Sequence, residues 1–305
     1  MLRRFLPCAT TLLAVAALGA TPATGAPRPG ATQRTVATPL GAPFAGPVRL
    51  AVTFDEGPSS SWVHADPTLL GSLSGRIVSS GGALTQDDPS GYAVPGDVAK
   101  VQGVADTDPG SGRLPTFSGT GPYAGYAVTA SDFGAADPLA PGYASVTWGA
   151  DVNVDPGVTA DKESSDNGNN VIQRGLAGND QYKLQVDSPG SAPTASCHVR
   201  DSGVETAWVR LSLKADVWYR IRCERTVEAG FDVLTVRVLD LRQGTVRTAT
   251  TTSTLPAANL DFPEASASYP TPLSIGVKTS ARGAVVVSNA DQLNGRVDNA
   301  YVAIG

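Results

Sequence analysis

Two adjacent carboxylates, Asp55 and Glu56, end the apolar run AVTFDEGP and could do hydrolytic chemistry. One carboxylate could act as a base while the other helps to bind a metal ion that activates water. Such a metal site is completed by imidazoles, which must converge on the ion. The chain has only two histidines, His64 and His198, and they lie far apart in the sequence. The pattern of a hydrolytic metal site is therefore incomplete.

The string TFDEGP differs in one residue from TFDDGP and so resembles the first motif of the polysaccharide deacetylases. Those enzymes are barrels in which strands alternate with helices. Glu56 replaces the second Asp of the motif and lengthens that side chain by one methylene. No convincing amphipathic helix follows the first residues of this chain, so we interpret the string as a first strand with Leu50, Val52 and Phe54 facing inward.

The start of the chain has the outline of a secretory signal peptide. Residues 1–26 contain the basic MLRR, an apolar stretch, and small residues at Thr24 and Ala26 before the expected cut. Ala, Gly and Arg are abundant, which is typical of a GC-rich bacterial genome. We therefore expect a secreted, extracellular bacterial protein exported with a Sec-type signal peptide. Residues 27–46 are rich in Pro, Gly and Thr, which favours a flexible leader, and residues 47–305 suit one large domain.

The charge balance of the chain limits its partners. There are 23 Lys and Arg against 28 Asp and Glu, a formal net charge of −5 at pH 7. Such a chain repels a polyanion overall, so we expect no nucleic acid partner unless a local basic patch exists. Past the signal peptide, no stretch approaches the roughly 20 apolar residues of a membrane helix, so we expect no membrane span.

Two cysteines remain once Cys8, in the apolar part of the signal peptide, is set aside. Cys197 and Cys223 each stand on a strand-like run, and an exported chain meets an oxidising compartment. A zinc site would need four ligands, and His198 is the only nearby imidazole. These residues favour a structural disulfide, which in the chain-entropy model stabilises the fold by roughly 3 to 4 kcal/mol.

Apolar residues recur with a period of two in YASVTWGADVNVD, QYKLQVD and VWYRIRCER, the alternation of half-buried strands. The residues predicted to face inward are Val146, Trp148, Ala150, Val152 and Val154 in the first run, Tyr182, Leu184 and Val186 in the second, and Tyr219, Ile221 and Cys223 in the third. AWVRLSL, DVLTVRVLD and PLSIGV are further strand candidates. Many short strands without helices between them predict an all-β fold with antiparallel sheets packed as a sandwich or jelly roll.

The order of the strand-like segments resembles the laminin G-like, concanavalin A-like lectin and glucanase jelly rolls of secreted bacterial proteins. The resemblance covers nearly all of residues 48–305 and rests on LAVTFDEGP, VTWGADVNVDP, NNVIQRGLAGNDQYKLQVD, SCHVR, VWYRIRCERT, LTVRVLD, PLSIGVKT and LNGRVDNAYVAIG. It implies a two-sheet antiparallel β-sandwich in which one sheet is concave and able to hold a saccharide or a protein loop.

The resemblance also implies that the first and last strands lie together, which would bring Glu56 and Asp298 to one edge. Related sandwiches often bind a structural Ca²⁺ there, because calcium prefers several oxygen ligands. Glu56 and Asp298 are therefore the candidate calcium ligands. The alternative is that Asp298 is a turn carboxylate and that Glu56 is a solvated loop end.

A candidate ligand-binding group lies on VWYRIRCER, where Trp218, Arg220 and Arg222 share the outward face. A Trp beside an Arg can stack on a sugar and hydrogen-bond a carboxylated glycan. If the disulfide joins a neighbouring strand, His198 and Arg200 would lie on the same face. The alternative is that Trp218 packs beneath a loop and that the arginines are solvated.

No catalytic constellation appears in the sequence. Glycosidases of this fold carry an E-x-D-x-E cluster, and no two of the six glutamates have that spacing with an Asp between them. Residues 161–170 fail as an EF-hand because Arg174 stands where a bidentate Glu is required. We therefore expect a non-catalytic binding module for carbohydrate or a cell-surface glycoconjugate. A protein-interaction or adhesion module is the alternative, and a polysaccharide-active enzyme is the third hypothesis.

Overall fold

The computed structural model of the chain describes residues 40–54, 64–65, 73–87, 98–101, 123–130, 137–155, 169–176, 178–187, 192–262, 271–287 and 291–305. All of these belong to one compact unit, Thr38–Gly305. A second unit, Met1–Ala37, lies outside the described residues, as does the predicted signal peptide. Every regular element in the described part of the chain is a β-strand, and each pair of adjacent strands is antiparallel.

The larger sheet, sheet A, has nine strands, and its main path runs β14-β13-β12-β7-β16-β1-β2. Two short strands continue from β16, which pairs with β5, and β5 pairs with β4. The bounds are β14 (Val246–Pro256), β13 (Phe231–Asp240), β12 (Trp218–Glu228), β7 (Val146–Val154), β16 (Gly295–Ile304), β1 (Val48–Val52), β2 (His64–Ala65), β5 (Val98–Val101) and β4 (Leu84–Asp87).

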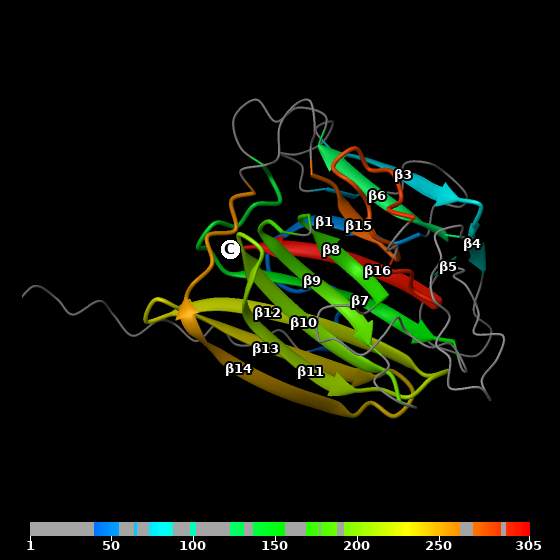
Figure 1. The fold of residues 1–305 in the computed structure, drawn as a ribbon. Coiled ribbons are helices and arrows are strands. Elements are labelled where there is room, and N and C mark those ends of the chain that lie inside the picture. The colour runs from blue at the N-terminus through cyan, green and yellow to red at the C-terminus, as the bar shows by residue number, and fades with distance from the viewer. Residues whose placement is uncertain are drawn as a thin grey trace, which may run out of the picture. The chain divides into compact units, whose positions relative to one another are not determined.

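The second sheet, sheet B, has seven strands in the order β11-β10-β9-β8-β15-β6-β3. In Figure 1, β9, β10 and β11 lie over β12, β13 and β14, so the two sheets form the layers of a sandwich. The bounds are β11 (Val204–Ser212), β10 (Thr194–Asp201), β9 (Gln181–Asp187), β8 (Asn169–Arg174), β15 (Leu273–Ile275), β6 (Tyr123–Ala130) and β3 (Leu73–Ser80). The prediction of an all-β, two-sheet antiparallel sandwich is confirmed.

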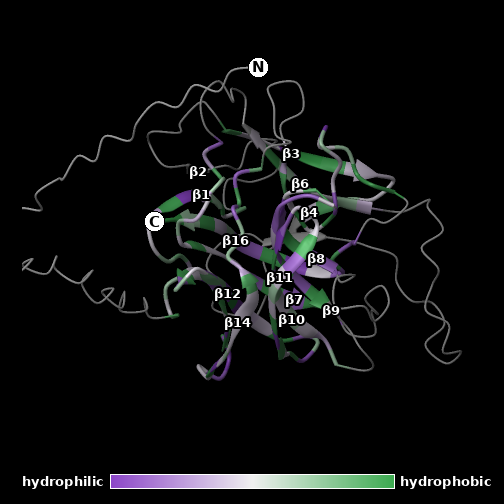
Figure 2. Cartoon of the chain, turned by 60° about the vertical axis from the view of Figure 1, so that its left-hand side comes forward, coloured by the Kyte–Doolittle hydropathy of each residue, from purple (hydrophilic) through white to green (hydrophobic). Residues whose placement is uncertain are grey.

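The inward residues of both sheets pack into one hydrophobic core, because alternate residues of a strand point to the same face. All of the residues predicted to face inward on β7, β9 and β12 are members of this core. At its centre Trp148 of sheet A lies against Tyr182 of sheet B, with ring centroids 5.2 Å apart. Figure 2 shows hydrophobic and hydrophilic residues along the same strands, as this alternation requires.

The predicted disulfide is confirmed, and it crosses the core rather than joining neighbouring strands. Cys197 on β10 of sheet B bonds to Cys223 on β12 of sheet A, with their Cα atoms 5.8 Å apart. Both cysteines are fully buried. Because the two cysteines point inward from opposite sheets, the outward neighbours of each cysteine lie on opposite sides of the sandwich.

The first and last strands pair, as the resemblance implies. Val52 of β1 lies opposite Ala300 of β16. Leu50, Val52 and Phe54 are members of the core, which confirms that these residues face inward, whereas Asp55 to Pro58 of AVTFDEGP lie outside the described residues. Phe54 lies just past the strand end with a φ of 58°, and its ring meets Tyr126 edge-on at 5.9 Å.

The strands are more deeply buried than their alternation predicts. Along β7 the polar residues Asp151 and Asn153 face outward, yet only 1% and 2% of their surfaces are exposed. Lys183 and Gln185 of β9 also face outward and are buried. Polar side chains in such positions need partners, because burying an unpaired polar group is costly.

Candidate functional site

The predicted ligand-binding group on β12 lies on the outer face of sheet A and is buried. Trp218 is 1% exposed, Arg220 7% and Arg222 1%. Arg220 forms a two-pronged ion pair with Asp151 of the neighbouring strand β7, with Nε to Oδ1 at 2.7 Å and Nη2 to Oδ2 at 2.8 Å. The three residues therefore share one face, as predicted, but a ligand in solvent does not reach them in this structure.

Residues 40–46 explain part of this burial, because they lie across the outer face of sheet A. Arg220 Nη1 donates to the carbonyl of Gly41 at 2.5 Å, and Arg222 Nη2 donates to that of Ala42 at 3.1 Å. Phe44 meets Tyr301 of β16 edge-on, with centroids 5.5 Å apart. This stretch is the end of the predicted leader, so the compact unit starts earlier than residue 47.

Gly149 of β7 makes room for this arrangement. A Cβ at this position would lie 3.0 Å from the ring of Tyr301 and 2.3 Å from the carbonyl oxygen of Ile221. Gly149 lies opposite Arg222 on one side and Tyr301 on the other. The glycine therefore lets the tyrosine ring pack over β7, beneath Phe44.

The candidate calcium ligand Asp298 lies on β16, opposite Asp151 of β7, and is fully buried. Its Oδ1 accepts from the backbone N–H of Asn299 at 2.7 Å, and its Oδ2 accepts from Asn299 Nδ2 at 2.8 Å. No group of three or more His, Cys, Asp or Glu side chains within the described residues is arranged to hold a metal ion. Glu56, the other candidate ligand, lies outside the described residues, so the calcium pair stays a prediction.

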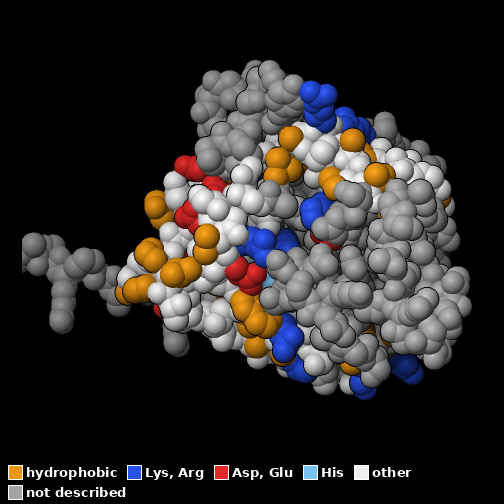
Figure 3. Space-filling model, viewed as in Figure 1, with side chains coloured by type: hydrophobic (Ala, Val, Ile, Leu, Met, Phe, Trp, Pro, Cys, Tyr) orange, Lys and Arg blue, Asp and Glu red, His pale blue; other side chains and the backbone are white. Residues whose placement is uncertain are grey.

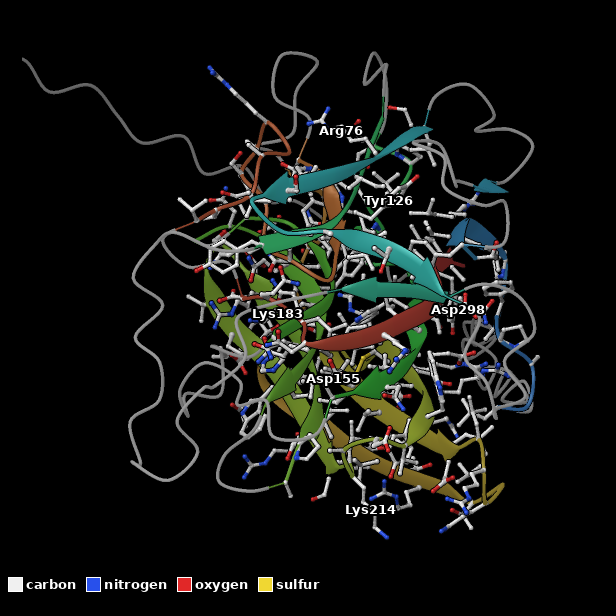
Figure 4. All side chains as sticks on the ribbon, turned by 90° about the vertical axis from the view of Figure 1, so that its right-hand side faces the viewer. Arg76, Tyr126, Asp155, Lys183, Lys214 and Asp298 are labelled. Carbon is white, nitrogen blue, oxygen red and sulfur yellow. A yellow bond between two sulfur atoms is a disulfide. The ribbon has the colours of Figure 1, made fainter. Side chains whose placement is uncertain are left out.

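The crossing disulfide sends His198 and Arg200 to the outer face of sheet B, away from Trp218. We expected them beside Trp218 only if the disulfide joined neighbouring strands, and it does not. Figure 4 views the sandwich from the side and shows Lys183, which lies opposite His198 in sheet B, and Asp298 of sheet A on opposite sides of the molecule.

The outer face of sheet B, over β8 to β11, carries two rows of polar side chains, which we call the polar rows. Cross-strand neighbours share a face, so the pairing register defines each row. The first row is Trp208, His198, Lys183, Gln173 and Ser274. The second row is Arg210, Ser196, Gln185 and Asn170. Amides, hydroxyls and charged groups thus replace the apolar residues of the inner face.

Exposure in the polar rows changes from floor to rim. The members on β8, β9, β10 and β15 are at most 4% exposed, whereas both members on the edge strand β11 are exposed. Trp208 is 38% exposed. Figure 3 shows basic, acidic and hydrophobic side chains gathered over this part of the surface. The rows therefore form a buried polar floor with an exposed aromatic and cationic rim.

A hydrogen-bonded chain holds the histidine of the floor. His198 Nε2 lies 3.0 Å from Ser196 Oγ, and His198 Nδ1 lies 3.2 Å from Glu205 Oε1. Glu205 also accepts from Arg200 Nη2 at 3.3 Å. The imidazole is parallel to the ring of Trp208, with an interplanar angle of 11° and centroids 6.1 Å apart. The hydrogen bonds to Ser196 and Glu205 thus fix the plane of the imidazole on which the exposed Trp208 stacks.

Burial and neighbouring charges determine the protonation of His198 and Glu205. Burial lowers the pKa of His198, and the positive charges of Lys183 and Arg200 lower it further against the opposing effect of Glu205. Burial raises the pKa of Glu205, but its contacts with His198 and Arg200 outweigh this, and the net pKa is lowered. His198 is therefore neutral and Glu205 ionised at neutral pH.

The order Ser196, His198, Glu205 matches that of a nucleophile, a base and an orienting acid. Chemistry of that kind needs a nucleophile that a substrate can reach. Ser196 and His198 are fully buried, so we assign the hydrogen-bonded side chains Ser196, His198 and Glu205 the role of orienting Trp208.

On β8, two buried amide oxygens have no hydrogen-bond partner among the described residues. They are Oδ1 of Asn169 and Oδ1 of Asn170, on residues that are 3% and 0% exposed. Asn170 uses its Nδ2 to donate to Gln173 Oε1 at 2.6 Å, and Gln173 in turn donates to the carbonyl of Gly175. A buried acceptor without a donor costs free energy, and both oxygens are as inaccessible to a ligand in solvent as Ser196 and His198.

At the rim, Arg210 lies over the face of Trp208, with its guanidinium carbon 5.2 Å from the ring centroid. Arg210 is exposed, and no carboxylate within the described part of the chain forms an ion pair with it. The pair was missed in the sequence, although AWVRLSL was predicted to be a strand. The available signal was the spacing Trp-x-Arg, which occurs both here and at Trp218.

Comparisons with known proteins assign no family to the chain. Neither a protein-family model nor a curated protein matches the sequence. The solved structures that resemble the chain include the tailspike protein 2 of bacteriophage CBA120, in its enzymatically active domain, at 11% identity and a TM-score of 0.43. That match covers 75% of this chain and 28% of the tailspike chain. The chain therefore spans little more than a quarter of that relative.

Two other similar structures are the LG1-3 region of the laminin alpha2 chain and the CBM2 module of the evolved Dit of Lactobacillus casei BL23 phage J-1. The laminin match has 12% identity and a TM-score of 0.34, and covers 53% of this chain and 30% of that one. The CBM2 match has 12% identity and a TM-score of 0.37, and covers 85% and 98%. At these identities no ligand or activity can be transferred to this chain.

The described residues contain no helix long and apolar enough to cross a membrane.

Proposed function

We propose that the chain is a secreted binding module of the laminin G-like, concanavalin A-like kind, whose ligand is a carbohydrate or a cell-surface glycoconjugate. One observation carries the proposal, namely that Trp208, 38% exposed, stands at the rim of a buried polar floor. The ordered sequence motifs that resemble laminin G-like domains support it. The signal-peptide pattern and the Cys197–Cys223 disulfide support export.

The chemistry of the rim suits a polyhydroxylated ligand. A sugar presents apolar C–H groups that can pack against an indole, and hydroxyl groups that can accept from a guanidinium. Of the two polar rows, Trp208 and Arg210 are the members that a ligand in solvent reaches. The buried members, among them Asn170, Gln173 and Ser274, belong to the floor behind this rim.

The proposed module is non-catalytic. The Ser196 hydroxyl, which has a base beside it, is fully buried. Asp55, on which the deacetylase hypothesis depends, lies outside the described residues. A polysaccharide-active enzyme remains the third hypothesis, and metal-dependent release of acetate that is abolished by Asp55→Asn would establish it.

A protein-interaction or adhesion module is the second candidate, and the edge strand β14 favours it. This strand is eleven residues long, and most of it is exposed, including Val246 at 52% and Leu255 at 41%. An edge strand presents unpaired backbone groups that another chain can extend. Competition by soluble sugars separates the two candidate functions. Soluble sugars would displace a bound glycan, but they would not displace a protein partner that pairs with β14.

A glycan and polysaccharide array, probed with the full chain, tests the proposal. We expect saturable binding that Trp208→Ala abolishes and that Tyr143→Ala leaves unchanged, since Tyr143 is also an exposed aromatic residue, at 62%, and belongs to neither polar row. A blank array with folded protein would overturn the carbohydrate proposal and favour a protein partner. A parallel array in chelator tests calcium at Asp298, because loss of binding there would indicate that an ion supports the fold or the site.

A further inference from the structure

We propose that the Trp208–Arg210 pair on β11 recognises a carboxylate carried by the saccharide, so that the ligand is an acidic glycan containing uronic acid residues. This inference rests on the proposed function and names its ligand class. It concerns the exposed rim of the site, not the buried floor.

The first observation is the state of Arg210. Its guanidinium is exposed and rests over the indole of Trp208 at 5.2 Å, without an ion-pair partner among the described residues. Most of the described arginines that are buried or half-buried do have an ion-pair partner. Arg220 is paired with Asp151, and Arg225 is paired with Asp232, both at 2.7 Å. An arginine held over a ring keeps its N–H edge available for a planar anion.

The second observation is the order of the stack beneath it. Trp208 lies between Arg210 on the second polar row and His198 on the first, and the parallel imidazole backs the indole. His198 is held at both nitrogens by Ser196 and Glu205. The tryptophan is thereby supported from below, and a stacked arginine loses less freedom on binding an anion than a mobile one does.

The third observation is the local charge. The chain as a whole carries a formal charge of −5, which repels polyanions at long range. On the outer face of β9 to β11, however, Lys183, Arg200 and Arg210 share the register with the carboxylates Glu205 and Asp187, and the side chain of Asp187 lies outside the described residues. Glu205 is already engaged by Arg200 and His198. Arg210 is the exposed charge of the two polar rows, so a carboxylate on the ligand would meet a cation at short range there.

A carboxylate fits Arg210 better than a neutral hydroxyl does. Two parallel N–H groups of a guanidinium match the two oxygens of a carboxylate, and such charge-assisted pairs are about twice as strong as neutral hydrogen bonds. The carboxylate of the uronic acid would meet the N–H edge of Arg210, and the sugar ring would pack against the exposed part of the Trp208 indole.

The test measures binding of the full chain to polygalacturonate, to the same polymer with its carboxyl groups reduced to alcohols, and to dextran sulfate. We expect binding to polygalacturonate and at least a 10-fold weaker affinity for the reduced polymer. Arg210→Ala should weaken polygalacturonate binding by about 10- to 100-fold, and Arg210→Lys should restore only part of it because the fork is lost.

The matched control is Arg247→Ala. Arg247 is also exposed and also lies over an aromatic ring, that of Tyr219 at 6.0 Å, but it stands on β14 of sheet A. It should leave binding unchanged. Because Arg210 and Arg247 are both exposed, neither variant is expected to alter folding, which thermal unfolding verifies.

Each outcome separates the two proposals. Equal binding to native and reduced polymer, lost with Trp208→Ala but not with Arg210→Ala, would overturn the carboxylate inference and keep the carbohydrate function. Preference for dextran sulfate over polygalacturonate would also overturn it, since the anion would then be a sulfate. No binding to any of the three polymers, together with a blank array, would overturn both.

Discussion

Two Trp-x-Arg pairs, with identical spacing, end on opposite outer faces of the sandwich. Trp218 and Arg220 lie on β12, which is flanked by β7 and β13, whereas Trp208 and Arg210 lie on the edge strand β11. In the first pair both side chains are buried, and the arginine is paired with Asp151. In the second pair both are exposed, and the arginine rests on its own tryptophan. Strand position, and not residue type, decides which pair can meet a ligand.

The two pairs also differ in what the chain itself supplies. Residues 40–46 bring the carbonyls of Gly41 and Ala42 to Arg220 and Arg222. Around Arg220 and Arg222 the outer face of sheet A is thus covered by backbone from the same chain. At the rim of sheet B, by contrast, no backbone carbonyl within the described residues accepts from Arg210, and the exposed part of Trp208 is open to solvent.

The largest expected effect separates the two tryptophans by stability. Trp218→Ala should lower the free energy of unfolding by about 3 to 5 kcal/mol, because a large side chain that is 1% exposed is removed. Trp208→Ala should cost about 0.5 kcal/mol, as is usual for an exposed position. Denaturant unfolding of the two variants measures this. Equal losses would show that the two faces are not different in packing.

A second comparison removes the acid from each arginine environment. Asp151→Ala leaves Arg220 buried without its carboxylate and should cost about 3 to 5 kcal/mol. Glu224→Ala, which breaks a pair whose side chains are 23% and 29% exposed, should cost at most about 1 kcal/mol. The same unfolding curves measure both. An Asp151 variant as stable as the Glu224 variant would contradict the buried ion pair.

The disulfide joins the two faces through the core, so its removal sharpens the comparison. Replacing Cys197 and Cys223 together by Ser should lower stability by about 2 to 5 kcal/mol. Cys197 precedes His198 of the sheet B face, and Cys223 follows Arg222 of the sheet A face. Polymer binding by the folded fraction of the variant therefore tests whether the disulfide only stabilises the fold. Unchanged binding of that fraction is expected, and loss of binding would give the disulfide a part in the site.

The smallest expected effect is the pH response of the sheet B face. Burial holds the pKa of His198 below the usual 6.5, so the unfolded chain takes up a proton that the folded chain does not. The stabilisation is present above pH 6.5 and is lost as the pH falls through the folded pKa. The groups facing the imidazole are Ser196, Glu205, Arg200, Lys183 and Trp208.

Unfolding measured from pH 7.5 to pH 5 for the parent and for His198→Gln tests this response. We expect the parent to lose stability more steeply than the variant below pH 6.5. Parallel curves would mean that His198 does not titrate differently in the two states.

Much of the fold could be predicted from the sequence because alternation is a local property. Leu184 and Ile221 face the core where the period of two places them. The cysteines could be paired by chemistry, but the sequence did not say that they belong to different sheets. Without that information, a disulfide between neighbouring strands was possible, and it would have put His198 on the same face as Trp218.

The site could not be predicted for the same reason. Whether a strand is central or at an edge is a property of the whole sheet, so Trp218 and Trp208 look equivalent in the sequence. The sequence also hides Asp151 as the partner of Arg220, because the two are brought together only by the pairing of β7 with β12. The covering by residues 40–46 is equally non-local.

Selective oxidation of tryptophan tests the central claim that the Trp208 face is open and binds the ligand while the Trp218 face is closed. The folded chain would be treated with limiting N-bromosuccinimide, with and without polygalacturonate, and the modified residues found by peptide mass mapping. We predict that Trp208 is oxidised before Trp218 and that the polymer protects Trp208. Oxidation of Trp218 first, or protection of Trp218 and not of Trp208, would contradict the account.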